Sequence, residues 1–412
     1  MLTAILPVRS LLLAIFMLMA GSGVLPTLIG LRLEKAGNGT LAIGAVATAY
    51  FLGLTVGAMR AGNWVKRVGH VRSFAAFVSV FSASTLAYGI YVSPVVWGAL
   101  RAVDGFCAAG VFVCLESWLN ERASPETRGG ILAGYMICLY LGQAVGQYLL
   151  NLGGVWPALP FVVASILISL AAVPVLMTLI PAPEIAENTP FSLKRLYSAS
   201  PLGLVGATVT GVMLGAFYGL AAVYARRLGM GLGQTSLFMS AVILGGVALQ
   251  WPLGFLSDRL DRRSVIVAVL IGTAFCAFAV AFTTTGGAML LGLGALFGGL
   301  SFALYPLCVA HTNDHLEPDE RVGASGGLVL LYSAGAALGP MAGATAMSVL
   351  TASGLFFFIA ACATGAAIFG LWRQITSPPV PVDEQQSYQI LPRTTPVAAT
   401  LDPYSPEEGM TE

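Results

Sequence analysis

Twelve long apolar segments constrain this chain more than any other feature of its sequence. Each holds about 20 mostly apolar residues, enough for a helix that crosses the hydrocarbon core of a bilayer. Of the 412 residues, 57% are hydrophobic and 9% are charged, whereas soluble domains average about 25% charged residues. The sequence therefore predicts an all-α membrane protein with twelve transmembrane helices. Their approximate ranges are 10–31, 41–61, 73–92, 95–119, 130–152, 157–180, 200–224, 234–257, 264–283, 287–311, 322–350 and 354–374.

The connections between these segments predict the domain organisation. The longest internal connection, 181–199, is expected to be a cytoplasmic central loop between an N-terminal six-helix half, 1–180, and a C-terminal half, 200–375. The tail, 376–412, is rich in Pro, Thr and acidic residues, so it is predicted to be disordered. The first segment could instead be a secretory signal, but its apolar run continues to Leu31 and many spans follow, which favours a membrane helix.

The distribution of Lys and Arg predicts the orientation. With the N-terminus in the cytoplasm, fifteen basic residues fall inside and four outside, and Arg101 is left in the membrane. Cytoplasmic loops carry an excess of Lys and Arg, so both termini are predicted to be cytoplasmic. The four outside residues are Arg32, Lys35, Arg226 and Arg227.

An internal repeat supports two equivalent halves. The segment 120–130, "NERASPETRGG", aligns without gaps to 313–323, "NDHLEPDERVG", at an offset of 193 residues that also pairs Gly142 and Gly146 with Gly335 and Gly339. "GNWVKRVGHV" from Gly62 aligns with "GFLSDRLDRR" at an offset of 192. Parallel repeats with a site between them are a transporter architecture.

Three motifs resemble those of the major facilitator superfamily. "GFLSDRLDRR" is similar to the family's signature loop G-x-x-x-D-R-x-G-R-R, and "LRAVDGFCAAG" to its fourth-helix motif. "ESWLN" followed by "RGGILAGY" resembles the bacterial YcaD-like branch. The resemblance covers about residues 10–375 and implies a facilitator fold in a bacterial inner membrane. It also implies gating residues, which are Gly62, Lys66, Arg67, Gly69, Gly254, Asp258, Arg259, Arg263, Gly335, Gly339 and Pro340.

The sequence departs from the family pattern at two loop positions and in the antiporter motif. Lys66 replaces the first-half Asp, and Asp261 replaces the second-half Gly. The antiporter motif G-x-x-x-G-P-x-x-G stands in full on the eleventh segment rather than the fifth, so it does not establish efflux by antiport. By the resemblance, Asp258 should approach the N-terminus of the fifth helix when the cytoplasmic side is closed, whereas Lys66 has the wrong sign for the equivalent contact.

The fourth segment carries charges inside an apolar run. Arg101 and Asp104 are three residues apart, so they share a helix face and can pair. Charges in a membrane interior cost roughly 2.5–3.5 kcal/mol each and often mark a transport pathway. The pair could lock helices together, or Asp104 could accept a proton and release Arg101. Glu116, nearer the cytoplasmic end, could serve as a proton exit or as an interfacial carboxylate beside Arg122 or Arg128.

The fifth segment carries a polar stripe formed by Gln143, Gln147 and Asn151. Amides facing lipid lack partners, so the stripe is expected to face a central cavity, although hydrogen bonding between helices is the alternative. The surrounding cavity would be apolar and aromatic, which favours a small amphipathic organic solute. The predicted cavity residues are Tyr50, Tyr140, Gln143, Gln147, Tyr218, Gln250, Tyr305 and Tyr332.

These features together predict a secondary transporter working by alternating access, with proton coupling through Arg101, Asp104 and Glu116. We expect a monomer in the lipid bilayer with a small-molecule substrate, and no cofactor, metal ion, catalytic residues or nucleic-acid partner. The six cysteines lie in apolar stretches without CxxC spacing, so they are expected to be buried thiols. A transport-inactive sensor or assembly factor of the same fold is the alternative, and a membrane enzyme fits poorly because no nucleophile–base pair stands out.

Overall fold

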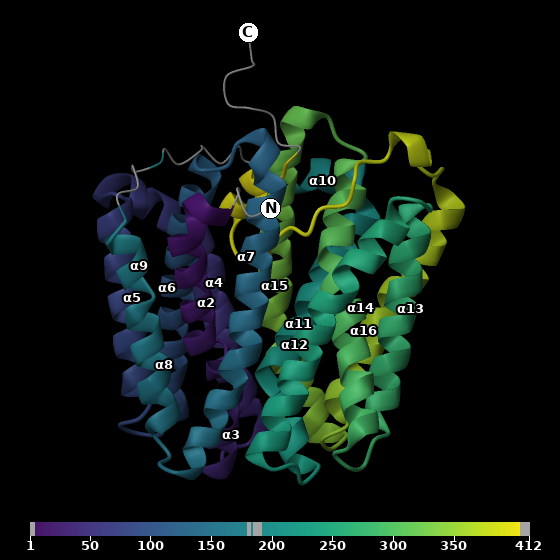
Figure 1. Cartoon of the computed structure of the whole chain (residues 1–412). Coiled ribbons are helices and arrows are strands. Elements are labelled where there is room, and N and C mark those ends of the chain that lie inside the picture. The colour runs from purple at the N-terminus through teal and green to yellow at the C-terminus, as the bar shows by residue number, and fades with distance from the viewer. Residues whose placement is uncertain (1–4, 179–182, 184–191, 404–412) are drawn as a thin grey trace.

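The computed structural model describes residues 5–178, 183 and 192–403, and these residues fold into a bundle of long helices (Figure 1). The first half contains η1 (Leu6–Val8), α2 (Arg9–Ser22), α3 (Leu25–Lys35), α4 (Thr40–Val68), α5 (His70–Ala87), α6 (Pro94–Glu121), α7 (Pro125–Gly146), η2 (Gln147–Gly154), α8 (Leu159–Leu170) and α9 (Ala172–Leu176). The second half contains α10 (Leu193–Ala199), α11 (Pro201–Arg227), α12 (Leu232–Ser257), α13 (Arg262–Ala281), α14 (Ala288–Asn313), α15 (Pro318–Val349) and α16 (Gly354–Thr376). Two short turns, η3 (Val382–Glu384) and η4 (Pro396–Leu401), follow.

The twelve predicted spans are confirmed as helices. Within the described ranges, eleven helical segments are long and apolar enough to cross a membrane, and α5 is the twelfth by position, packed against α6 and α8. The segment Leu6–Lys35 is one of the eleven, which favours the membrane-helix reading of the N-terminal run over a secretory signal. Most of the predicted central loop lies outside the described residues, and α10 occupies its end.

The two halves pack by the same scheme, which confirms the pseudo-symmetry. In the first half α2 pairs with α7, α4 with α6 and α5 with α8; in the second, α11 pairs with α15, α12 with α14 and α13 with α16. The repeated glycines explain one of these pairs. A Cβ on Gly142 or Gly146 would lie 2.5 or 2.3 Å from a backbone oxygen of α2, and on Gly335 or Gly339, 2.3 or 2.2 Å from one of α11.

The halves touch each other at one end of the bundle. The start of α2 and the chain after α16 lie together at the end called here the termini face, while α3 reaches the opposite face (Figure 1). Toward the opposite face, Glu34 pairs with Arg227 across the halves at 2.7 Å. Ser240 donates a hydrogen bond to the Ala144 carbonyl at 2.8 Å, and Thr48 donates one to the Ala337 carbonyl at 3.0 Å. The bundle is therefore joined directly at the opposite face.

At the termini face, the tail fills the space between the halves. We call residues 377–403 the tail; it crosses the termini face (yellow in Figure 1), and its η4 turn packs against α6, α7 and α15. Most of η4 is buried. The structure here departs from the predicted disorder, because the short apolar run "PVAATL" finds a groove between the halves. Averaged over 37 polar-rich residues, that run was invisible in the composition; residues 404–412 lie outside the described chain.

Candidate functional site

A central cavity of about 140 Å³ lies between the halves. Five of the eight predicted cavity residues line it: Tyr50, Tyr140, Gln143, Tyr218 and Tyr332. They come from α4, α7, α11 and α15, so both halves contribute, and the Tyr218 hydroxyl donates to Gln143 Oε1 across them at 3.5 Å. Phe51, Phe81, Phe112 and Leu139 complete an apolar and aromatic wall.

Three predicted cavity residues do not line the cavity. Gln147 is buried, accepts a hydrogen bond from Thr27 at 2.9 Å and donates to the Gly23 carbonyl at 2.8 Å, so it joins α7's end to α3. This is the interhelical alternative for the polar stripe. Gln250 is buried in α12. Tyr305 packs behind Tyr332, with ring centroids 5.4 Å apart. Sequence spacing placed these side chains at a suitable depth but could not give the rotation of their helices.

Arg101 and Asp104 form the predicted pair. Their side chains approach to 3.6 Å and are 3% and 0% exposed, so both charges are withdrawn from water. Asp104 also accepts hydrogen bonds from the Tyr88 hydroxyl at 2.6 Å and from Ser84, both on or beside α5. Arg101 faces the cavity, and its guanidinium lies 4.0 Å from the centre of the Tyr50 ring. Asp104 is thus anchored behind a cation that borders the cavity.

Sequence reasoning missed Ser84 and Tyr88 as partners of Asp104. The two residues lie four apart, so they fall on one face of the third predicted helix. That spacing was a usable signal, because a polar pair in an apolar helix needs a polar neighbour.

Glu116 is fully buried in α6, and its partners come from an unexpected place. Tyr135 of α7 donates to its carboxylate at 2.7 Å, and the tail residues Thr394 and Thr395 donate to its two oxygens. In the described parts of the chain no ion pair joins Glu116 to Arg122 or Arg128, so the interfacial alternative is wrong.

The tail also places a cation inside the bundle. The Arg393 guanidinium lies 4.5 Å from the ring centre of Phe302, 5.4 Å from that of Tyr332 and 5.9 Å from that of Tyr140. These three rings, from α14, α15 and α7, are called here the aromatic cage. Arg393 borders the central cavity beside the rings. The sequence analysis assigned Arg393 to a disordered segment and so missed it.

The signature-loop residues of the second half hold the tail. Asp258 accepts hydrogen bonds from Arg262 at 2.9 Å and from the Tyr388 backbone amide at 2.8 Å. The predicted approach of Asp258 to the α7 N-terminus near Gly129 and Gly130 is therefore not present, because the tail lies in between and supplies the amide. The ring of Tyr388 also lies over Gly254, where a Cβ would come within 2.1 Å of it.

A buried ion pair supports the same contact. Asp314 pairs with Arg262 at 2.6 Å and accepts the Gln386 amide at 3.0 Å. Burial raises the pKa of the Asp314 carboxyl above its usual range, and the neighbouring Arg262 guanidinium acts in the opposite direction. Arg263 donates to the Ser377 carbonyl at 2.7 Å. Charged groups near the second-half loop thus bind the tail backbone at several points.

The remaining predicted gating residues divide into two groups. The side chains of Lys66 and Arg67 are exposed and, within the described chain, make no hydrogen bond or ion pair; Gly62 has open space around it, and Gly69, at φ +95°, ends α4. Arg259 stacks 3.6 Å from the centre of the Phe255 ring. Only the second-half loop contacts the tail.

Gly335, Gly339 and Pro340 bring three helices together. Both glycines allow α15 to lie against α11, and a Cβ on Gly44 of α4 would come within 2.8 Å of the Pro340 carbonyl oxygen. The motif therefore sits where the second half meets the first, toward the opposite face.

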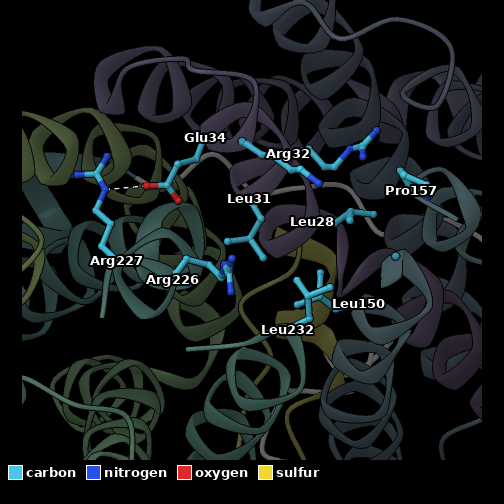
Figure 2. Close-up of a pocket in the computed structure, with 11 residues that line it drawn as sticks. Leu28, Leu31, Arg32, Glu34, Leu150, Pro157, Arg226, Arg227 and Leu232 are labelled. Carbon is cyan, nitrogen blue, oxygen red and sulfur yellow. Dashed lines mark hydrogen bonds and ion pairs between the residues drawn. The ribbon is translucent and has the colours of Figure 1, made fainter. Parts of the chain in front are cut away.

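A second pocket, of about 410 Å³, opens at the opposite face (Figure 2). Arg32, Lys35, Arg226 and Arg227, the four basic residues predicted to lie outside, all line it. Arg227 reaches across to Glu34, as the dashed line in Figure 2 marks, and also donates to Thr40 at 3.0 Å. Sequence analysis identified these residues but not their convergence.

Comparisons with known proteins agree with this architecture. The sequence model of the Major Facilitator Superfamily matches residues 11–233 and 202–400. The chain is 31% identical over 362 residues to the uncharacterized MFS-type transporter YcaD of Salmonella arizonae, covering 86% of this chain and 92% of that protein. YcaD of Salmonella enteritidis is 30% identical over 358 residues, with the same coverage.

Solved structures show the same fold. The nucleoside transporter NupG has a TM-score of 0.74 at 14% identity, covering 88% of this chain and 98% of that one. A bacterial homolog of the human lysosomal transporter Spinster, inward-facing and occupied, has a TM-score of 0.74 at 16% identity, covering 92% and 98%. These relatives and neighbours are transporters, not enzymes.

Proposed function

Because the chain belongs to the major facilitator superfamily, we propose that it is a secondary transporter that moves a small amphipathic organic solute by alternating access, coupled to protons. One observation carries the proposal. The central cavity is lined by residues of both halves, and the buried Arg101–Asp104 pair borders it. Relative motion of the halves would expose this cavity to one side of the membrane at a time.

The direct contacts between the halves support an assignment of state. Glu34–Arg227, Ser240–Ala144 and Thr48–Ala337 all lie toward the opposite face. With the termini in the cytoplasm of a bacterium, as the Lys and Arg distribution predicts, the opposite face is periplasmic. The described conformation is then closed outside, with its cytoplasmic opening filled by the tail.

Asp104 is the residue we propose for proton coupling. When it is ionised it pairs with Arg101; when protonated it keeps its hydrogen bonds from Ser84 and Tyr88 but loses most of its attraction for the guanidinium. Arg101 would then be free to turn toward substrate in the cavity. Glu116 would be a second titrating site, nearer the termini face and directly bonded to the tail.

The test is flux in reconstituted vesicles. Organic solutes that raise the melting temperature of the purified protein are first identified, since binding to the folded state stabilises it. Each is then offered in labelled form with and without a pH gradient. We expect accumulation that follows the gradient and collapses with a protonophore. Stabilisation without flux under any gradient would refute transport and favour the sensor alternative.

A further inference from the structure

The aromatic cage around Arg393 is built like a cation site. Aromatic faces attract a cation within about 6 Å of the ring centre, most strongly where water is excluded. Phe302, Tyr332 and Tyr140 meet this distance, and they are drawn from both halves of the bundle. Phe302 and Tyr140 also contact each other, with centroids 5.6 Å apart, so the cage does not depend on the tail to hold its shape.

The charges around the cavity favour the same ligand. Arg101 is paired with Asp104, and the one remaining carboxylate near the tail, Glu116, is held by hydroxyl groups instead of a cation. With Glu116 ionised, the four groups Arg101, Asp104, Glu116 and Arg393 sum to zero. Without Arg393 the sum is −1, so one added monovalent cation would restore neutrality in a region where an unpaired charge is costly.

The attachment of the tail separates it from the cage. Its backbone is held by Asp258 and Asp314, which lie outside the cage, while the Arg393 side chain alone enters the rings. A tethered group of this kind competes as an intramolecular ligand, with an effective concentration set by its linker.

We propose that the aromatic cage is the binding site for a monovalent organic cation with a flat or quaternary head group and an apolar body, and that Arg393 occupies this site as an internal competitor. This proposal rests on the proposed transport function, because it names the substrate class of the same cavity. The head group would take the place of the Arg393 guanidinium among the rings. The apolar body would lie against Phe51, Phe81 and Leu139.

Binding of phenylguanidine to the full-length protein, measured by calorimetry in detergent, tests the proposal. Phenylurea, which has a similar shape but no charge, is the control ligand. If the tail occupies the cage about nine-tenths of the time, its removal tightens the apparent affinity about tenfold, because that affinity scales with the competent fraction. We therefore expect Arg393→Gln to bind phenylguanidine about tenfold more tightly than the wild type, with no change for phenylurea.

Two further variants guard the interpretation. Arg373→Gln, which removes an arginine lying 5.8 Å from the centre of the Trp372 ring on α16, is the matched control and should bind like the wild type. Gly254→Ala leaves the cage and Arg393 intact but displaces the Tyr388 ring, so it should also tighten phenylguanidine binding. Phe302→Leu in the Arg393→Gln background should weaken binding roughly 2- to 30-fold, the range for one lost cation–π contact.

Unchanged phenylguanidine affinity in both Arg393→Gln and Gly254→Ala would overturn the proposal, and the tail would then be a structural strut. Equal gains for phenylurea and phenylguanidine would also overturn it, because the cage would then lack charge preference. Equilibrium binding needs no membrane gradient. Flux of other solutes without cation binding therefore rejects the substrate class alone, whereas cation binding without flux rejects transport and leaves the cage as a binding site.

Discussion

The Glu34–Arg227 pair gives a direct test of alternating access. It joins α3 to α11 at 2.7 Å, and its two side chains are 23% and 32% exposed. Pairs with such exposure contribute about 0.2–1 kcal/mol, and Arg227 makes one more cross-half hydrogen bond, to Thr40 at 3.0 Å. We therefore assign about 1 kcal/mol to the contact, which corresponds to roughly a fivefold change in the ratio of the two conformations.

The perturbation is Arg227→Gln, which keeps the size of the head group but removes its charge. Spin labels at Ala36 and Thr285, exposed residues of the two halves at the opposite face, would report the distance between the halves by pulsed electron resonance. We expect the population with a long inter-half distance to rise about fivefold in the variant.

The control is the exchanged pair, Glu34→Arg with Arg227→Glu. If the contact acts as an ion pair, the exchange should recover most of the original distribution, and a double-mutant cycle gives the coupling energy. An identical distance distribution in the wild type and in Arg227→Gln would refute the reasoning, because the pair would then make no contribution to closing the opposite face.

Three further predictions concern coupling, the tail and packing. Asp104→Asn should abolish accumulation driven by a pH gradient while leaving exchange of substrate measurable, because the asparagine cannot carry the proton; normal accumulation in vesicles would show that Asp104 is structural. Glu116→Gln should loosen the tail, since an amide is a weaker acceptor for Thr394 and Thr395 than a carboxylate; we expect faster proteolysis within 385–395, and unchanged cleavage would contradict this. Gly339→Ala should lower the melting temperature by several degrees, because its Cβ would lie 2.2 Å from the Val212 carbonyl oxygen, whereas Gly62→Ala, in open space, should not; equal melting temperatures would show that α15 moves at little cost.

The sequence by itself determined the architecture, because each step of that inference depends on one segment or on pairs at a fixed offset. About 20 apolar residues require a spanning helix whatever its neighbours are, and the repeat at 192–193 residues requires two equivalent halves. The Arg101–Asp104 pair was also predictable, because residues three apart on one helix meet without help from any other element. Most of the aromatic cavity wall followed from rare polar positions in apolar helices.

Only the tertiary structure decided which helix faces meet and where the tail lies. Gln147 and Gln250 had suitable depth, but their helices turn them into helix packing instead of the cavity. Arg393 lies in a segment whose composition predicts disorder, and it becomes ordered because Asp258, Asp314 and Glu116, distant in sequence, supply acceptors on both sides of one opening. Such a site depends on the relative placement of two halves, which no local pattern in the chain encodes.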